Sequence, residues 1–142
     1  MDIKMDIIYD ENLPPIKKYF ELFETTGWNE SFKLLPDEID KAVRKSWYTI
    51  SAYQNNELIG FGRIVSDGVM HAMIYEMIVR PDFQRKGIGA QILLKLLDKC
   101  KSHKIRDIHL FCAKGKRAFY EKYDFTARPD DAPGMQYKRN YY

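Results

Sequence analysis

Five residues around the start of an apolar, helix-like run have the types needed to bind an anion. They are Gln84, Arg85, Lys86, Gly87 and Gly89, and they follow a strand-like run that ends at a proline. The first turn of a helix has unpaired N–H groups and a partial positive charge, so it stabilises a phosphate. Glycines let the anion approach the backbone, and the two cations add charge. The alternative is that the glycines only relax a tight connection between strand and helix.

Dinucleotide binding is the obvious competing interpretation of this glycine pattern. It requires G-x-G-x-x-G inside a parallel βαβ unit, with an acidic residue about 20 positions later. The spacing here is Q-x-x-G-x-G, and several predicted strands precede it where the dinucleotide pattern would stand near the N-terminus. The pattern therefore favours a different phosphate-bearing ligand.

Glu76 is a lone carboxylate in the otherwise apolar run at residues 73–79. Burying an unpaired carboxylate is costly, so we expect it to be paired, partly hydrated or raised in pKa. A raised pKa suits a general base that takes up a proton through water. The alternative is a structural ion pair with Arg63 on the preceding predicted strand.

The elements that would position these residues follow from hydrophobic periodicity and turn residues. We expect, in order, a strand at 5–9, helices from 16 and 36, strands at 47–53, 58–66 and 71–80, a helix at 88–101, a strand at 105–112, a helix at 114–123 and a last strand at 134–141. Gly27 is the expected C-cap of the first helix. This order predicts an α/β (α+β) fold with a mixed, mostly antiparallel sheet of six to seven strands and about four helices on both faces.

Composition narrows the class of protein. The chain has 142 residues, 45% of them hydrophobic, which predicts a single domain spanning 1–142. A net charge of +3 is too small to indicate nucleic acid binding. Cys100 and Cys112 fit no metal motif, so no metal is expected. Without a signal-like N-terminus or a membrane-length apolar run, we expect a cytoplasmic protein with no membrane partner.

Two motifs in this sequence resemble those of the GNAT superfamily of N-acetyltransferases. The run at 75–93 reads YEMIVRPDFQRKGIGAQIL, and the run at 117–125 reads RAFYEKYDF. The predicted order of strands and helices is similar to that family's over nearly the whole chain. Two positions depart from the pattern: Asp124 stands where the family usually has glycine, and Ala113 where it often has an asparagine that helps to hold the cofactor.

The resemblance implies an acetyl-CoA-dependent N-acetyltransferase. The cofactor's pyrophosphate would lie on backbone amides at the start of the third long helix, and its pantetheine arm would pair with the end of the strand before it. In the family, the strands at 71–80 and 105–112 would splay apart there. The residues expected to contact acetyl-CoA are Met77, Ile78, Val79, Gln84, Arg85, Lys86, Gly87, Ile88, Gly89, Ala90 and Phe119.

The resemblance also implies roles in catalysis. Tyr120 would be the acid that protonates the leaving thiolate, because a phenol is protonated at neutral pH. The N–H of Ile78 or Val79 would stabilise the oxyanion, and Glu76 is the candidate base for the reason given above, its place in an apolar run. The amine would attack directly in a ternary complex. Two further interpretations stay open: Tyr120 as an ordinary core aromatic, and a covalent route through Cys112, which has no predicted partner base.

The acceptor is expected to be a primary amine of a small molecule. Its binding region would lie in residues 23–36 and 128–142, where aromatic and acidic side chains suit a cationic amine. An ordinary core with a solvated loop explains the same residues. The sequence also leaves open a protein or peptide acetyltransferase, a toxin-type enzyme acting on aminoacyl-tRNA, and a non-catalytic acetyl-CoA sensor. A homodimer is possible by resemblance.

Overall fold

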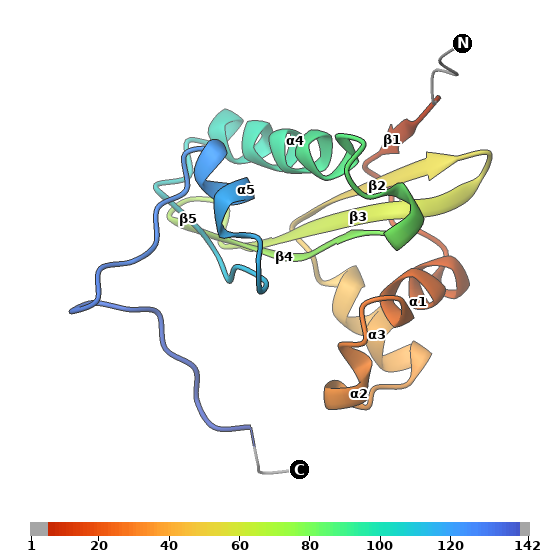
Figure 1. Cartoon of the computed structure of the whole chain (residues 1–142), viewed down its shortest axis with the longest axis horizontal. Coiled ribbons are helices and arrows are strands. Elements are labelled where there is room, and N and C mark those ends of the chain that lie inside the picture. Colours follow the sequence, from red (N-terminus) through yellow and green to blue (C-terminus); the bar gives the residue numbers. More distant parts are fainter. Residues whose placement is uncertain (1–5, 140–142) are drawn as a thin grey trace. The chain divides into compact units, whose positions relative to one another are not determined.

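The computed structural model describes residues 6–139, which contain five strands and five α-helices (Figure 1). In chain order they are β1 (Ile8–Asp10), α1 (Ile16–Glu24), α2 (Asn29–Phe32), α3 (Pro36–Arg44), β2 (Tyr48–Gln54), β3 (Glu57–Ser66), β4 (His71–Val79), the 3-10 turn η1 (Pro81–Phe83), α4 (Ile88–Ser102), β5 (Asp107–Leu110) and α5 (Arg117–Lys122). None of the helices in this part of the chain is both long and apolar enough to cross a membrane.

The strands form one sheet in the order β1-β2-β3-β4-β5. All neighbours are antiparallel except β4 and β5, which are parallel and are joined through α4. Asn55 and Asn56, both at positive φ, make the tight turn between β2 and β3, a conformation that asparagine tolerates well. The expected mixed, mostly antiparallel sheet is therefore confirmed.

The expected counts of six to seven strands and about four helices are wrong. The short helix α2 was not foreseen, and residues 134–139 form no strand. Met135 and Tyr137 are 85% and 81% exposed, so the alternation that predicted a strand there buries no face that would hold it. The rest of that predicted strand, and Met5 of the first one, lie outside the described residues.

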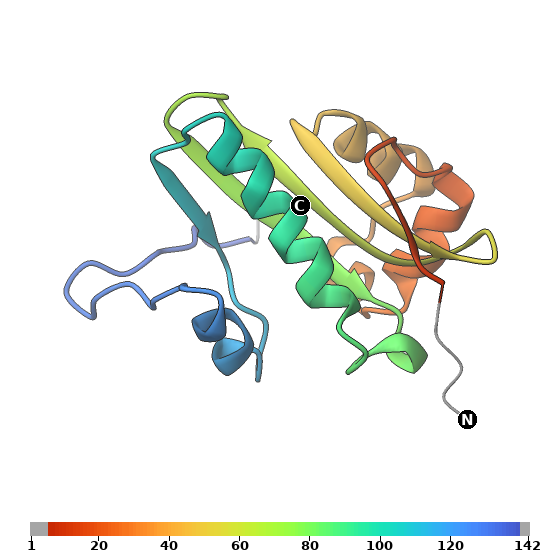
Figure 2. The ribbon, with the colours of Figure 1, turned by 90° about the horizontal axis from the view of Figure 1, so that it is seen from above.

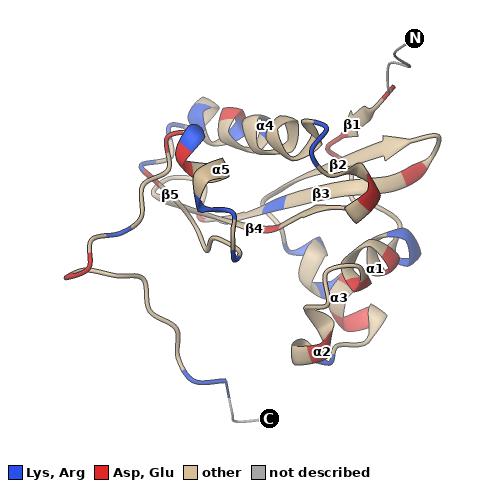
Figure 3. Ribbon diagram, viewed as in Figure 1, with Lys and Arg blue, Asp and Glu red and all other residues tan. Residues whose placement is uncertain are grey.

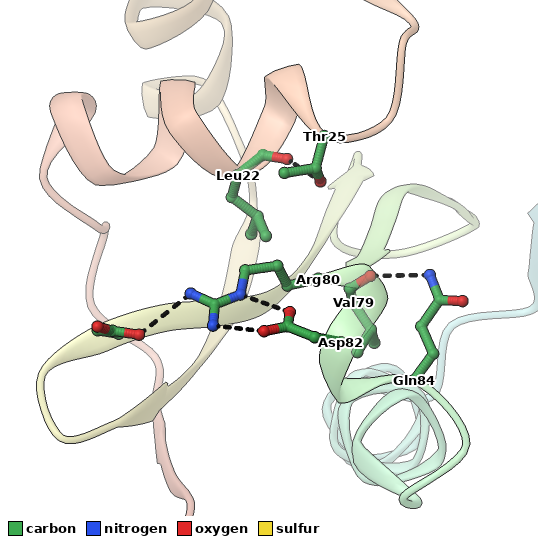
Figure 4. Close-up of polar contacts among 7 residues, drawn as sticks. Leu22, Thr25, Val79, Arg80, Asp82 and Gln84 are labelled. Atoms are coloured by element: carbon green, nitrogen blue, oxygen red, sulfur yellow. Dashed lines mark hydrogen bonds and ion pairs between the residues drawn. The ribbon is translucent and has the colours of Figure 1, made fainter.

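The end of α1 also differs from expectation. The helix stops at Glu24, before Gly27. The hydroxyl of Thr25 donates to the carbonyl of Leu22, as Figure 4 shows, and that of Thr26 donates to the carbonyl of Phe23. The backbone N–H groups of Thr25 and Thr26 donate to the same two carbonyls, so the last turn is closed without a glycine cap. Gly27, at φ 76°, serves the following turn.

Helices cover both faces of the sheet, with α1 and α3 on one side and α4 lying across the other (Figures 1 and 2). The α1/α3 side holds a buried cluster of Tyr19, Leu22, Phe23, Ile39, Val43, Leu58, Phe61 and Ile78. On the other side α4 approaches β3 closely. A Cβ added at Gly62 would lie 2.8 Å from Ile92 Cγ2 and 2.9 Å from the sulfur of Met77, so glycine is needed for this packing.

The chain divides into two compact units, one up to Phe111 and one from Cys112 onward. The first contains the whole sheet with α1 to α4. The second contains α5, whose Tyr120 ring packs edge-on against Phe119 at 5.0 Å and Phe125 at 5.8 Å. That the chain functions as one domain stays a prediction.

Candidate active site

The neighbouring strands β4 and β5 pair over only part of their length. The pairing runs from His71 opposite Asp107 to Ile74 opposite Leu110, and β4 continues alone to Val79. On that side, the backbone of β4 beyond Ile74 has no strand partner within residues 6–139. The edge expected to receive an extended ligand is therefore available, and it leads directly toward the loop before α4.

A β-bulge interrupts β4 at Glu76. Phe61 pairs with Ile78 and Arg63 pairs with Tyr75, so Gly62 lies opposite two residues, Glu76 and Met77. Glu76 has φ 48°, a left-handed conformation that is unusual for a residue with a side chain. Bulges of this kind redirect side chains and commonly lie beside functional sites. Here the bulge places Met77 toward α4, while Glu76 faces Arg63.

The loop that leads into α4 has backbone N–H groups without an acceptor from Arg85 onward, whereas the N–H of Gln84 donates to the carbonyl of Pro81. Arg85 and Gly87 have φ 62° and 82°, and Gly87 is the N-cap residue of the helix. Across the described chain, the six consecutive N–H groups from Arg85 to Ala90 have no hydrogen-bond acceptor. A Cβ at Gly87 would meet no atom within 4 Å, so the space beside it is open. This geometry suits a diphosphate.

Three cations lie near this loop, but Arg80 is engaged by neighbouring carboxylates. It makes a two-point contact with Asp82, Nε to Oδ1 at 2.7 Å and Nη2 to Oδ2 at 2.9 Å (Figure 4), and a third contact at 3.1 Å with Glu57. These partners raise the pKa of Arg80, with Asp82 the main cause. Within the described chain Arg85 and Lys86 make no ion pair with a carboxylate, and they give the basic stretch before α4 in Figure 3. Lys86 is near enough to Asp82 to add to the lowering of that carboxyl's pKa, which Arg80 mainly causes.

Gln84 fixes the loop to the end of β4. Its side-chain amide donates to the carbonyl of Val79 at 3.0 Å (Figure 4). The amide group therefore ties the strand end to the first residue after η1, and it holds the loop in its open conformation. This is a structural role within the loop. Direct contact of Gln84 with the cofactor stays a prediction.

Glu76 is largely buried and paired. Its side chain is 23% exposed and that of Arg63 is 12% exposed, with 3.4 Å between Glu76 Oε2 and Arg63 Nε. Neither of these two atoms makes a hydrogen bond of good geometry within the described residues. Burial raises the pKa of the Glu76 carboxyl, and Arg63 offsets only part of that effect. The expected ion pair therefore exists, and it leaves a basic carboxylate oxygen without a donor.

Tyr120 lies on α5 in the second unit and is 8% exposed. Burial, with a smaller electrostatic contribution from Cys112, raises the pKa of Tyr120 to about 12. Its ring packs against aromatic neighbours, as the core alternative expects, and its phenol stays protonated, as the acid role requires. Phe119 lies beside it.

The structure brings most of the predicted site residues together in the first unit, along the end of β4 and the start of α4. The pairing of Asp82 and Glu57 with Arg80 was not predicted from the sequence. Nor was the close packing of α4 on β3 that Gly60 and Gly62 allow. The G-x-G spacing in an apolar strand was a usable signal for close helix packing. No group of three His, Cys, Asp or Glu side chains within residues 6–139 could hold a metal ion.

The aromatic residues of the expected acceptor region are partly core. Phe23 is 4% exposed, and Trp28 packs edge-on against it with 6.1 Å between ring centroids. Glu24 accepts a hydrogen bond from the Asn29 side chain. For Phe23 and Trp28 the interpretation as ordinary core therefore fits the structure better than that of a substrate-binding surface.

Known proteins resemble this chain in sequence and in structure. A chain described as the uncharacterised N-acetyltransferase ycf52 of Porphyra purpurea is 30% identical over 139 residues, covering 94% of this chain and 78% of its own length. The crystal structure of a probable acetyltransferase from Staphylococcus aureus superposes with a TM-score of 0.81 at 20% identity, covering 94% of this chain and all of that one. Glucosamine-6-phosphate N-acetyltransferase from Arabidopsis thaliana superposes with a TM-score of 0.68 at 15% identity, covering 96% and 99% of the two chains.

The match to a family profile covers most of the chain. The sequence profile of the acetyltransferase (GNAT) family matches residues 13–125, which include the sheet from β2 to β5, the loop before α4 and the helix that carries Tyr120. This protein therefore belongs to the GNAT family and is an N-acetyltransferase.

Proposed function

We propose that the protein transfers the acetyl group of acetyl-CoA to a primary amine of a small molecule by direct attack in a ternary complex. The observation that carries this proposal is the run of six acceptor-free N–H groups from Arg85 to Ala90 within the described chain, which includes two cationic residues that make no ion pair there. Such a run is costly unless water or an anionic ligand occupies it, and a diphosphate supplies the matching acceptors.

In this proposal the pantetheine arm follows the open edge of β4. Its amides pair with backbone groups of Met77 to Val79, beyond the point where β5 stops pairing. Arg85 and Lys86 attract the phosphates, while Arg80 contributes little because Asp82 and Glu57 neutralise it. The thioester then lies near the bulge, beside Glu76.

Glu76 and Tyr120 divide the proton transfers. The Glu76 carboxylate accepts a proton from the ammonium group of the acceptor, through water, and leaves a neutral amine that attacks the thioester carbonyl. The N–H of Ile78 or Val79 stabilises the oxyanion. As the C–S bond breaks, the phenol of Tyr120 protonates the CoA thiolate, and the proton that the attacking nitrogen then loses returns through water to the Tyr120 phenolate. The pKa of about 12 keeps that phenol in its acidic form throughout the neutral range.

A small amine as the acceptor is supported by one protein of the same fold, the glucosamine-6-phosphate N-acetyltransferase of Arabidopsis thaliana, whose name gives it a small amine as its substrate. A homodimer is the assembly expected by resemblance.

The test is release of free CoA thiol from acetyl-CoA in the presence of an amine panel. The panel contains amino sugars, polyamines, arylalkylamines, and peptides with a free N-terminus or lysine. We expect turnover with at least one small amine. Turnover with peptides alone would show a protein acetyltransferase, and calorimetric binding of acetyl-CoA without any turnover would show a sensor.

A further inference from the structure

Arg63 on β3 is the charged group closest to Glu76, and it is held by contacts on two sides. Its Nη2 donates to Glu76 Oε1 at 3.5 Å. Its Nη1 donates to the hydroxyl of Ser46 at 3.2 Å and to the carbonyl of Ala42 at 3.4 Å, both at the end of α3. The guanidinium is therefore fixed between the bulge and the C-terminal end of a helix, where a cation is favoured.

We propose that Arg63 is a positioning residue that keeps the carboxylate of Glu76 charged and oriented as a base. The inference rests on the proposed function in so far as Glu76 is that base. A largely buried carboxylate without a cation nearby takes up a proton and cannot accept another. With the guanidinium 3.4 Å away, the carboxylate form persists, and Glu76 Oε2 still lacks, among the described residues, a hydrogen-bond donor that would compete with the acceptor's proton.

Few other titratable groups face Glu76. From α1 the phenol of Tyr19 approaches; it is 2% exposed, and burial together with the charge of Glu76 raises its pKa far above neutrality, so it stays uncharged. From α3 the groups that reach Arg63 are a hydroxyl and a carbonyl, which do not titrate. Tyr75 lies on β4 with its ring 5.7 Å from the guanidinium. Arg63 is therefore the cation that sets the charge of Glu76.

The ion pair of Arg63 with Glu76 is more buried than an ion pair on the protein surface. Its side chain is 12% exposed, whereas the helix pair of Arg44 with Asp40 has 65% and 27% exposure. A charge in such a buried position affects its partner strongly, because water does not screen it. Arg44 is the matched control, since its loss removes an arginine near the same helix end without touching Glu76.

The experiment compares Arg63→Gln, Arg63→Lys and Arg44→Gln with the unchanged protein. Gln is neutral but can still donate to Ser46, and Lys keeps the charge. The first readout is NMR titration of the Glu76 side-chain carbon, identified by its loss in Glu76→Gln. The second is the pH dependence of kcat/KM with one acceptor throughout, so that the acceptor's own ionisation is common to all variants.

We expect the Glu76 titration to move to higher pH in Arg63→Gln and to return most of the way in Arg63→Lys, with no change in Arg44→Gln. The acid limb of kcat/KM should move with it, and below that limb activity falls by about tenfold for each unit of displacement. Circular dichroism checks folding. If Arg63→Gln does not fold, Arg63→Lys still tests the inference, because lysine keeps the positive charge. A kcat/KM of Arg63→Lys that falls and does not recover at higher pH would overturn the role of charge.

The two hypotheses fail in different ways. An unmoved Glu76 titration in Arg63→Gln overturns the inference about Arg63 and leaves Glu76 free to be the base. A titration that moves while the acid limb of kcat/KM stays in place shows that Glu76 is not the base, so the proposed mechanism fails although the electrostatic coupling exists.

Discussion

At the scale of single residues, the pKa values of the two candidate proton-transfer groups, Glu76 and Tyr120, are both raised, and the shift serves a base in one case and an acid in the other. Burial raises the pKa of the Glu76 carboxyl, which makes it a better base, and raises that of Tyr120 to about 12, which keeps it an acid. The types of these residues were predictable from the sequence. So was the pairing of Glu76 with Arg63, but the β-bulge that positions Glu76 was not, because no local sequence pattern marks it.

Replacing Tyr120 with phenylalanine tests the acid role. The change removes the phenol but keeps the ring among Phe119 and Phe125, so we expect folding and acetyl-CoA affinity to be retained. We expect kcat to fall by about 100-fold, within the usual contribution of a general acid. Stopped assays of thiol release and calorimetry with acetyl-CoA measure the two effects. Tyr123→Phe is the matched control, and equal turnover in both variants would leave Tyr120 as a core aromatic.

Among secondary-structure elements, the loop before α4 was well predicted and the last strand was not. Proline, two glycines and an apolar helical stripe specify a strand, a turn and a helix locally, and α4 indeed begins at Ile88. The segment at 134–139 had only an alternating pattern, which forms a strand when a partner edge pairs with it. The sequence alone also could not show whether Asp124, which stands where the family usually has glycine, preserves the turn after α5.

Asp124 replaces the family's glycine without loss of the turn. It has φ 69° and follows the end of α5, where its N–H donates to the carbonyl of Glu121 and that of Phe125 donates to the carbonyl of Tyr120. These two bonds make a Schellman motif, whose left-handed position favours glycine. Aspartate tolerates this conformation better than most residues, so the substitution preserves the helix end.

Gly60 and Gly62 lie on the face of β3 that packs against α4, so substitutions at these two positions test that packing. At Gly62 an added Cβ would meet Ile92 Cγ2, Met77 Sδ and Leu96 Cδ1, all within 3.0 Å. At Gly60 the only contact this short is the terminal methyl of Ile92, at 2.9 Å. We expect Gly62→Ala to lower the free energy of unfolding by about 1–3 kcal/mol, as overpacking does, and Gly60→Ala to lower it less. Urea denaturation of both variants measures the difference, and equal losses would contradict the packing described here.

At the scale of the whole molecule, family membership and reaction class are established, while the acceptor is not. The motif that binds the donor is short and local, so the sequence specifies it. An acceptor site is assembled from segments far apart in the chain, and two of its expected aromatics proved to be core. The cytoplasmic location and the homodimer stay predictions.

The last prediction concerns which amides in the molecule respond to acetyl-CoA. Apart from the open edge of β4 beyond Ile74, most amides inside the sheet and the helices are already hydrogen-bonded, whereas those from Arg85 to Ala90 have no acceptor within residues 6–139 and should exchange hydrogen rapidly in the free protein. Phosphate oxygens would occupy them, so saturating acetyl-CoA should slow their exchange by about tenfold or more, the effect of adding a protecting hydrogen bond of at least about 1.4 kcal/mol. Amides of α1 and of the β2–β3 hairpin serve as internal references and should change little. Exchange mapped by mass spectrometry decides the matter: uniform slowing would indicate only general stabilisation, and unchanged exchange at 85–90 would remove the diphosphate from this loop.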